Sequence, residues 1–245
     1  MAERSSGGLQ SALGLLTVVP GGPEMRAGAV AWFPVVGAVL GSVLGALWWG
    51  LGRLLPPLVA GALVLLADLA VTGLLHVDGL IDAADGLLPH LEVTRRLQVM
   101  AEPQAGAFGV ATAVALLGLR LAALGSALPG SAFSGAILLG SIWMGSRSIM
   151  GLAVTHLRNV RDNGMASLLQ GGSSVPSLLG LVVAAGALAS WHLPEGPAVL
   201  GAEVAGAGAV YWLAHRRLGG YTGDVLGAAG LVGETVALVV AAAKW

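Results

Sequence analysis

Residues 27–52 read AGAVAWFPVVGAVLGSVLGALWWGLG, a run without a single charged side chain. About 20 apolar residues in a helix are enough to cross the hydrocarbon core of a bilayer. Segments 121–146 and 163–191 are also free of charge, and charged residues make up only 10% of the chain. Soluble proteins typically carry about 25%. The composition therefore predicts an all-α, polytopic integral membrane protein.

Apolar runs of spanning length predict about seven transmembrane helices within one domain covering residues 1–245. Their approximate bounds are 28–51, 54–75, 106–128, 131–156, 176–193, 197–214 and 222–243. The run at 9–20 is too short to span, so we expect a partly inserted or interfacial N-terminal segment. Asp68 lies inside the second predicted span, where an ionisable group should face the protein interior or a wet cavity.

The arginines indicate how the chain is oriented in the membrane. Seven crossings place four loops on one side, at residues 20–27, 76–105, 157–175 and 215–221. These loops carry Arg26, Arg95, Arg96, Arg158, Arg161, Arg216 and Arg217. The other side has only Arg53 and Lys244. The positive-inside rule then predicts that the polar loops face the cytoplasm, in the cytoplasmic membrane of a bacterium or archaeon. This bias alone accounts for Arg95, Arg96, Arg216 and Arg217.

Other features of the sequence limit which binding partners are expected. A stripe of Gly37, Gly41 and Gly45 in the first span permits close approach of another helix and is a candidate face for a homo-oligomer. The net charge of −1 gives no indication of nucleic-acid binding. The chain has no cysteine, which excludes disulfides and thiolate metal sites. The lipid bilayer is the predicted surrounding.

Three of the thirteen acidic residues lie within eight positions, in the stretch HVDGLIDAADG at residues 76–86. In a helix, Asp78, Asp82 and Asp85 would fall at i, i+4 and i+7 and share one face. Oxygen ligands at this spacing suit Mg²⁺, or Mn²⁺, better than Zn²⁺. A solvated helix face or an Asp-Gly turn is the alternative. His76 is a further ligand, a general base, a phosphate contact or simply a structural residue.

A second polar cluster, GGYTGD at residues 219–224, opens the last predicted span. Gly220 and Gly223 would let the backbone approach a ligand, and a helix N-terminus favours phosphate. Thr222 either contacts that ligand or caps the helix. Asp224 could join the metal site, and Glu234, about three turns deeper, could belong to a buried polar network.

Three arginines are candidates for binding phosphate, because a guanidinium matches phosphate oxygens well. Arg147 lies in the cytoplasmic half of the fourth predicted span, and Arg158 and Arg161 follow it. Arg120 lies closer to the opposite face, where a structural ion pair is its expected use. Carboxylates for a metal, arginines for anions and a glycine-rich turn together indicate metal-dependent transfer chemistry on a phosphorylated substrate.

These motifs resemble those of the cobalamin synthase family, the adenosylcobinamide-GDP ribazoletransferases. The stretches that carry the resemblance are WFPVVG at 32–37, TGLLHVDGLIDAADG at 72–86, MAEPQAGAFG at 100–109, VRDNGM at 160–165 and GGYTGDVLGA at 219–228. There are two departures. Gln104 stands where the family usually has arginine, which removes a cation near Glu102. Leu74 stands where a second glycine is common, and we interpret this as a packing difference.

The resemblance implies a Mg²⁺-dependent enzyme with adenosylcobinamide-GDP and α-ribazole, or its 5′-phosphate, as substrates. The products would be adenosylcobalamin, or its phosphate, and GMP. Asp78, Asp82, Asp85 and Asp224 would hold the metal, and Asp82 and His76 would be catalytic. Arg147, Arg158 and Arg161 would contact phosphates, with Glu102 and Glu234 as polar support.

Two rival functions come from other classes. CDP-alcohol phosphotransferases also place aspartates on membrane helices, but their Asp-Gly-x-x-Ala-Arg pattern fails here, where Asp85-Gly86 is followed by LLPH. A cation-coupled transporter would use Asp68, Glu203 and Glu234. Transport would need ionisable groups lining a path to both faces, whereas most of these charges are predicted on one side.

Overall fold

The computed structural model describes residues 2–21, 27–126, 128–161 and 164–244, and every regular element within them is a helix. The α-helices are α1 Ala2–Leu16, α2 Phe33–Gly52, α3 Pro57–Val71, α4 Leu75–Leu87, α5 Val93–Val99, α6 Ala107–Ser126, α7 Ala132–His156, α8 Val175–Trp191, α9 Glu195–Leu218 and α10 Gly223–Ala241. Two 3₁₀ turns complete them, η1 Ala27–Trp32 and η2 Met165–Leu169. The all-α prediction is confirmed.

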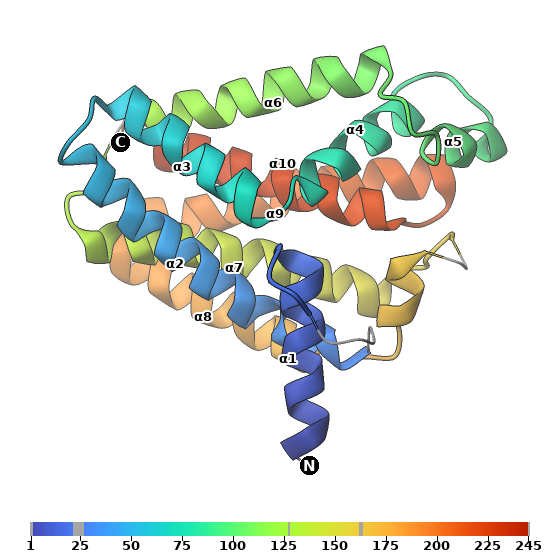
Figure 1. Cartoon of the computed structure of the whole chain (residues 1–245), viewed down its shortest axis with the longest axis horizontal. Helices are drawn as coiled ribbons and strands as arrows, with labels where there is room; N and C mark the ends of the chain where they lie inside the picture. Colours follow the sequence, from blue (N-terminus) through green and yellow to red (C-terminus); the bar gives the residue numbers. More distant parts are fainter. Residues whose placement is uncertain (1, 22–26, 127, 162–163, 245) are drawn as a thin grey trace.

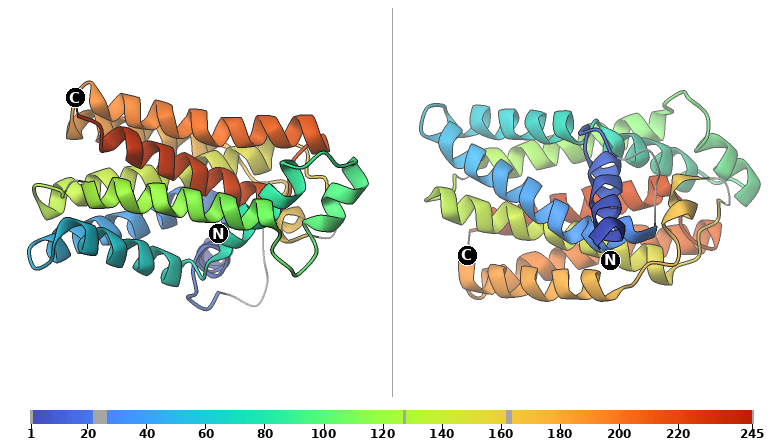
Figure 2. Two further views of the ribbon diagram at one scale, coloured as in Figure 1. Left: turned by 90° about the horizontal axis from the view of Figure 1, so that it is seen from above. Right: turned by 60° about the horizontal axis from the view of Figure 1, so that its bottom comes forward.

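The seven longest apolar segments run along the same direction as a bundle, which the two further views also show (Figures 1 and 2). These are α2, α3 and α6 to α10, each close to a predicted span. By length and composition, five of the described helices could cross a membrane alone, and α3 qualifies only together with α4. The apolar helix α8 has 17 residues and is shorter. The chain is therefore a polytopic membrane protein with shorter third and eighth helices.

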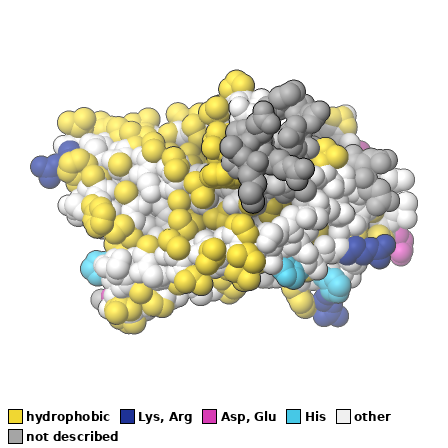
Figure 3. Space-filling model, turned by 90° about the horizontal axis from the view of Figure 1, so that it is seen from below, with side chains coloured by type: hydrophobic (Ala, Val, Ile, Leu, Met, Phe, Trp, Pro, Cys, Tyr) yellow, Lys and Arg dark blue, Asp and Glu magenta, His cyan; other side chains and the backbone are white. Residues whose placement is uncertain are grey.

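The polar segments gather at one end of this bundle. Helices α4 and α5, turn η2 and the start of α10 lie together there, whereas the C-terminus lies at the other end (Figures 1 and 2). Between the ends, hydrophobic side chains cover much of the face shown in Figure 3, and most arginine, lysine and histidine side chains on that face lie towards its two ends. Within the described residues, the predicted clustering of the polar loops at 76–105, 157–175 and 215–221 is confirmed, whereas most of the predicted loop at 20–27, with Arg26, lies outside those residues.

A sharp bend joins α3 to α4. The two helices make an angle of 86°, and Gly73 and Leu74 at the bend both have φ of 61°. This left-handed conformation costs an L-residue roughly 1–2 kcal/mol, and glycine adopts it freely. The glycine expected at position 74 is thus favoured for its backbone conformation, so the interpretation of Leu74 as a packing difference was wrong. With this bend, α3 and α4 together form either a broken span or a re-entrant segment.

The glycine stripe of α2 packs against α7 of the same chain. A Cβ atom on Gly37, Gly41 or Gly45 would lie within 2.4 Å of a backbone carbonyl oxygen, of Trp143, Leu139 and Gly135 respectively. Such small-residue stripes allow membrane helices to approach closely. The prediction that this face is free to form a homo-oligomer is therefore wrong, because α7 already covers it.

Helix α1 lies across the bundle rather than along it (Figure 1). It begins at Ala2, earlier than the predicted segment 9–20, and ends at Leu16. Its buried residues Ala12 and Leu16 pack into the hydrophobic core that includes Ala29, Val30 and Phe33. The end of α1 is thereby held beside the polar end of the bundle.

We predict that Gly45→Ala lowers the thermal midpoint of the detergent-solubilised protein, because overpacking costs about 1–3 kcal/mol. The new Cβ would lie 2.0 Å from the carbonyl oxygen of Gly135. Gly50→Ala in the same helix is the control, since no atom lies within 4 Å of its added Cβ. Thermal unfolding followed by size-exclusion chromatography compares the two. Equal midpoints would contradict the close α2–α7 contact.

Candidate functional site

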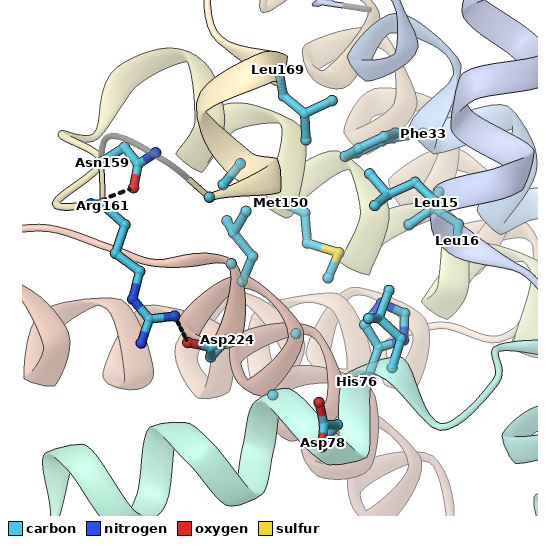
Figure 4. A pocket seen from close by; sticks show the side chains of 17 residues that line it. Leu15, Leu16, Phe33, His76, Asp78, Met150, Asn159, Arg161, Leu169 and Asp224 are labelled. Atoms are coloured by element: carbon cyan, nitrogen blue, oxygen red, sulfur yellow. Dashed lines mark hydrogen bonds and ion pairs between the residues drawn. The ribbon is translucent and has the colours of Figure 1, made fainter. Parts of the chain in front are cut away.

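A cavity of about 230 Å³ lies at the polar end of the bundle. One part of its lining is polar, with His76, Asp78, Asn159, Arg161 and Asp224. The remainder is mainly apolar and includes Leu15, Leu16, Phe33, Met150 and Leu169 (Figure 4). The polar residues come from α4, from the loop after α7 and from the start of α10, so the tertiary fold assembles them from three separate stretches of sequence.

Close packing of α4 on α10 brings two carboxylates to this cavity. A Cβ atom added to Gly79 would lie 2.9 Å from the carbonyl oxygen of Asp224, so only a glycine fits there without a shift. Asp78, next to Gly79, and Asp224 both line the cavity. The prediction that Asp224 completes the site begun by α4 is in line with this placement.

Asp224 is held by its neighbours in the first turn of α10. The Arg161 guanidinium donates to its carboxylate at 2.9 Å, and the Thr222 hydroxyl donates at 3.2 Å. Thr222 also accepts a hydrogen bond from the backbone N–H of Val225 at 3.3 Å and is fully buried. Thr222 therefore caps the helix, which is one of the two roles predicted for it. Gly223 lines the cavity.

Arg158 and Gly220 were also predicted to bind phosphate, and both take part in the pairing of two loops. The backbone N–H of Tyr221 donates to the Arg158 carbonyl at 2.9 Å, and that of Val160 donates to the Tyr221 carbonyl at 3.0 Å. A Cβ atom on Gly220 would lie 2.1 Å from the Arg158 carbonyl. Gly220 thus permits the two loops to pair. Neither it nor the exposed side chain of Arg158 lines the cavity, and phosphate binding by either residue stays a prediction.

The Asp78–Asp82–Asp85 stretch is helical, as predicted, but its carboxylates do not converge. Asp85 accepts backbone hydrogen bonds from Gly106 at 2.7 Å and Gly109 at 2.9 Å, at the start of α6. A carboxylate is favoured at a helix N-terminus, where N–H groups lack partners within the helix. Asp85 therefore joins α4 to α6, and its predicted role as a metal ligand is not supported.

Asp82 lies among like charges. The carboxylates of Asp224 and Asp78 lie close enough to repel its negative charge. Within the described part of the chain, no three His, Asp or Glu side chains converge closely enough to hold a metal on their own. Mg²⁺, however, is commonly bound by one or two carboxylates together with substrate phosphates. Asp78 and Asp224, with Asp82 nearby, fit that donor set.

His76 lies in the first turn of α4 and lines the same cavity. Its side chain is buried. A neutral imidazole has one nitrogen able to accept a proton.

Arg147 is removed from the cavity by a buried ion-pair network. It donates to Glu234 and, at 2.9 Å, to the Ser146 hydroxyl, and only 1% of it is exposed. The prediction that Arg147 contacts phosphate is therefore corrected. Glu234 also accepts from Arg120 at 2.8 Å, which confirms the predicted structural pairing of Arg120 and the buried network around Glu234.

The same network includes the second predicted span. Arg120 donates to Asp68 at 2.9 Å, and the Trp143 indole donates to the other oxygen of Asp68 at 3.0 Å. The Arg120 guanidinium also lies 4.7 Å from the centre of the Trp143 ring. Asp68 thus faces the protein interior, as expected. Two cations and two carboxylates from α3, α6, α7 and α10 neutralise one another.

Two arginines, Arg96 of α5 and Arg217 of α9, position the end of α4. Arg96 donates to the carbonyl of Gly86 at 2.7 Å, and Arg217 donates to that of Leu87 at 2.9 Å. Both therefore bind carbonyls at the C-terminus of α4, beyond the positive-inside role predicted for them. Glu102 forms an ion pair with Arg95 at 2.8 Å at the partly exposed surface, which is polar support away from the cavity.

Sequence reasoning missed the apolar wall of the cavity and Asn159. Leu169 and Met150 carry no signal in a chain so rich in apolar residues. Asn159 follows Arg158 in a loop where only the arginines indicated phosphate binding. Two members of the VRDNGM motif, Asp162 and Asn163, lie outside the described residues.

The chain was compared with known proteins. The model of the family described as cobalamin-5-phosphate synthase matches residues 8–242. A protein of Chlorobaculum tepidum named adenosylcobinamide-GDP ribazoletransferase is 35% identical over 96% of this chain and 94% of its own. A protein of the same name from Desulforamulus reducens is 33% identical over 93% and 92%. No solved structure matches the chain.

We predict that the buried network is held by charge balance. Arg120→Gln leaves Asp68 without its cation, and removing one partner of a buried ion pair typically costs 3–5 kcal/mol. The thermal midpoint in detergent should therefore fall strongly. Asp68→Asn combined with Arg120→Gln leaves the Arg147–Glu234 pair intact and should recover part of this loss. A double variant no more stable than Arg120→Gln would contradict the charge-balance account.

Proposed function

Because the chain belongs to the cobalamin-5-phosphate synthase family, we propose that it joins adenosylcobinamide-GDP to α-ribazole, or to its 5′-phosphate, and releases GMP. The observation that carries the proposal within the structure is the cavity where Asp78 and Asp224 from facing helices meet Arg161. Carboxylates suited to a divalent cation and a guanidinium suited to phosphate are the groups that a diphosphate substrate requires.

The proposed reaction is a phosphoryl-group displacement. A ribazole hydroxyl oxygen forms a bond to the phosphorus attached to cobinamide. The bond from that phosphorus to the bridging oxygen breaks, and GMP leaves with the bond's electron pair. The hydroxyl proton must be accepted by a neighbouring base or by water. Catalysis of this kind depends mainly on positioning and on stabilising negative charge.

Asp78 and Asp224 would hold Mg²⁺, or Mn²⁺, with Asp82 close by. The ion, when bound, offsets the negative charge of the diphosphate. The repulsion between the carboxylates around Asp82 favours a bound cation at this point. Since Mg²⁺ is completed by substrate oxygens in many enzymes, a site with few protein carboxylates suits a diphosphate substrate.

Arg161 would contact the phosphates. Its Nη1 now donates to Asp224, its Nη2 donates to the Leu97 carbonyl at 3.2 Å, and its side chain is partly exposed. A guanidinium has five N–H donors, so several remain for phosphate oxygens. His76, which lines the cavity, is the candidate acceptor of the hydroxyl proton.

We further propose that the polar end of the bundle faces the cytoplasm in a bacterial or archaeal inner membrane. The arginines of α5, of the loop after α7 and of the end of α9 support it, because positive charge is retained on the cytoplasmic side. The site would then be open to soluble phosphorylated substrates.

We predict that Asp78→Asn, Asp82→Asn and Asp224→Asn each lower the rate of GMP release at least about 100-fold, because each removes charge from the site facing the diphosphate. Purified protein is incubated with adenosylcobinamide-GDP, α-ribazole and Mg²⁺, and GMP is measured by chromatography. EDTA should stop the reaction and added Mg²⁺ should restore it. Glu92→Gln, at an exposed acidic residue, is the matched control. Full activity in Asp82→Asn would contradict the assignment.

The orientation is testable because the natural chain has no cysteine. Val93→Cys lies at the polar end and Leu54→Cys at the opposite end, and both positions are exposed. A membrane-impermeant maleimide should label Val93→Cys in inside-out vesicles and Leu54→Cys in intact spheroplasts. Labelling of Val93→Cys in spheroplasts would place the site on the outer face instead.

A further inference from the structure

The cavity has two chemically different parts. Leu15 and Leu16 of α1, Phe33, Met150 and Leu169 form the apolar part, and the charged residues form the polar part (Figure 4). We infer that the apolar part holds the dimethylbenzimidazole ring of α-ribazole, with its ribose directed to the polar part. This inference rests on the proposed function and assigns one substrate to one region of the site.

The size of the cavity restricts which part of the substrates can enter. Its volume of about 230 Å³ is below the roughly 300–1,000 Å³ of pockets that enclose drug-sized ligands. A corrin macrocycle with its side chains and adenosyl group is far larger than such a ligand. Only a nucleoside-sized part fits, which leaves the ribazole base or the guanosine of the donor.

Polarity separates these two candidates. Guanine carries hydrogen-bond donors and an acceptor along its edge, and an apolar wall would leave those groups unpaired, at a cost in binding. The wall is formed by leucine, phenylalanine and methionine side chains. Dimethylbenzimidazole presents two methyl groups and an aromatic surface, and its single free ring nitrogen is a hydrogen-bond acceptor. The ribazole base therefore matches the wall better.

Asn159 supplies a donor at the edge of this wall. Its Oδ1 accepts a hydrogen bond from the backbone N–H of Arg161 at 3.1 Å, which orients the amide. Its Nδ2 is buried and has no hydrogen-bond partner in the described structure, although Asn159 lines the cavity. Buried donors are nearly always paired, so this one is available for a ligand. The ring nitrogen or a ribose oxygen of α-ribazole would satisfy it.

Leu169→Ala tests the assignment. Leu169 is 2% exposed and lines the cavity, whereas its neighbour Leu168 is 56% exposed and does not. Removing methyl groups from a hydrophobic pocket typically changes discrimination by about 10–200-fold. Leu169→Ala should therefore raise the KM for α-ribazole about tenfold and leave the KM for adenosylcobinamide-GDP unchanged. Leu168→Ala is the matched control and should change neither.

A second acceptor substrate tests whether the apolar wall recognises the two methyl groups of the base. Benzimidazole riboside lacks the two methyl groups, so the wild type should bind it more weakly than α-ribazole. Leu169→Ala should reduce this preference because part of the wall that contacts the methyl groups is gone. An unchanged preference, or a rise in the KM for adenosylcobinamide-GDP alone, would overturn the assignment. If Leu169→Ala does not fold, Leu169→Met provides the same comparison with a smaller perturbation.

Equilibrium binding of α-ribazole, followed by its own fluorescence without the donor substrate, separates this inference from the proposed function. Absence of GMP release by the wild type would contradict the proposed function. Binding of α-ribazole that weakens in Leu169→Ala and not in Leu168→Ala would still support the subsite. If the wild type releases GMP but Leu169→Ala does not weaken the binding of α-ribazole, only the subsite assignment is overturned.

Discussion

The pairing of charges inside the bundle is the constraint on which the rest of the structure depends. A cation or carboxylate among apolar helices is costly unless a partner neutralises it. Glu234 on α10 receives both Arg120 of α6 and Arg147 of α7, and Arg120 also reaches Asp68 of α3. These contacts fix four helices relative to one another. Because α4 follows α3 and packs on α10, the position of the cavity is set from within the membrane part of the fold.

The three aspartates of α4 show how one helical pattern can lead to three different environments. Asp78 lines the cavity, and Asp82 lies among like charges. Asp85 binds the start of α6. Their spacing dictates only that they share a helix face. What each carboxylate does depends on the element that lies opposite it, and here α10 and α6 differ. Side chains that share a helix face therefore need not share a binding site.

The sequence determined the class of fold and most helix bounds well, because charge-free runs and their flanking polar residues are local signals. It also predicted that Asp68 faces the interior or a wet cavity and that Arg120 forms a structural ion pair, since an isolated charge there is too costly. Contacts between distant segments were not predictable. Nothing local indicates that the Gly45 face packs on α7 instead of a second molecule, that Arg147 is occupied by Glu234, or that Leu169 turns into the cavity. At position 74, the sequence showed only an unexpected residue type and gave no sign of the left-handed backbone conformation of Leu74.

The Arg161–Asp224 ion pair explains how one small site can accommodate both an anion and a cation. In the structure the two side chains neutralise each other at 2.9 Å and are both partly exposed. Because both side chains are partly exposed and line the cavity, ligands can reach them there. On the proposed function, the diphosphate would take over the guanidinium and the divalent ion would take over the carboxylate. Each charge would keep an opposite partner throughout, and neither ligand would be favoured strongly without the other.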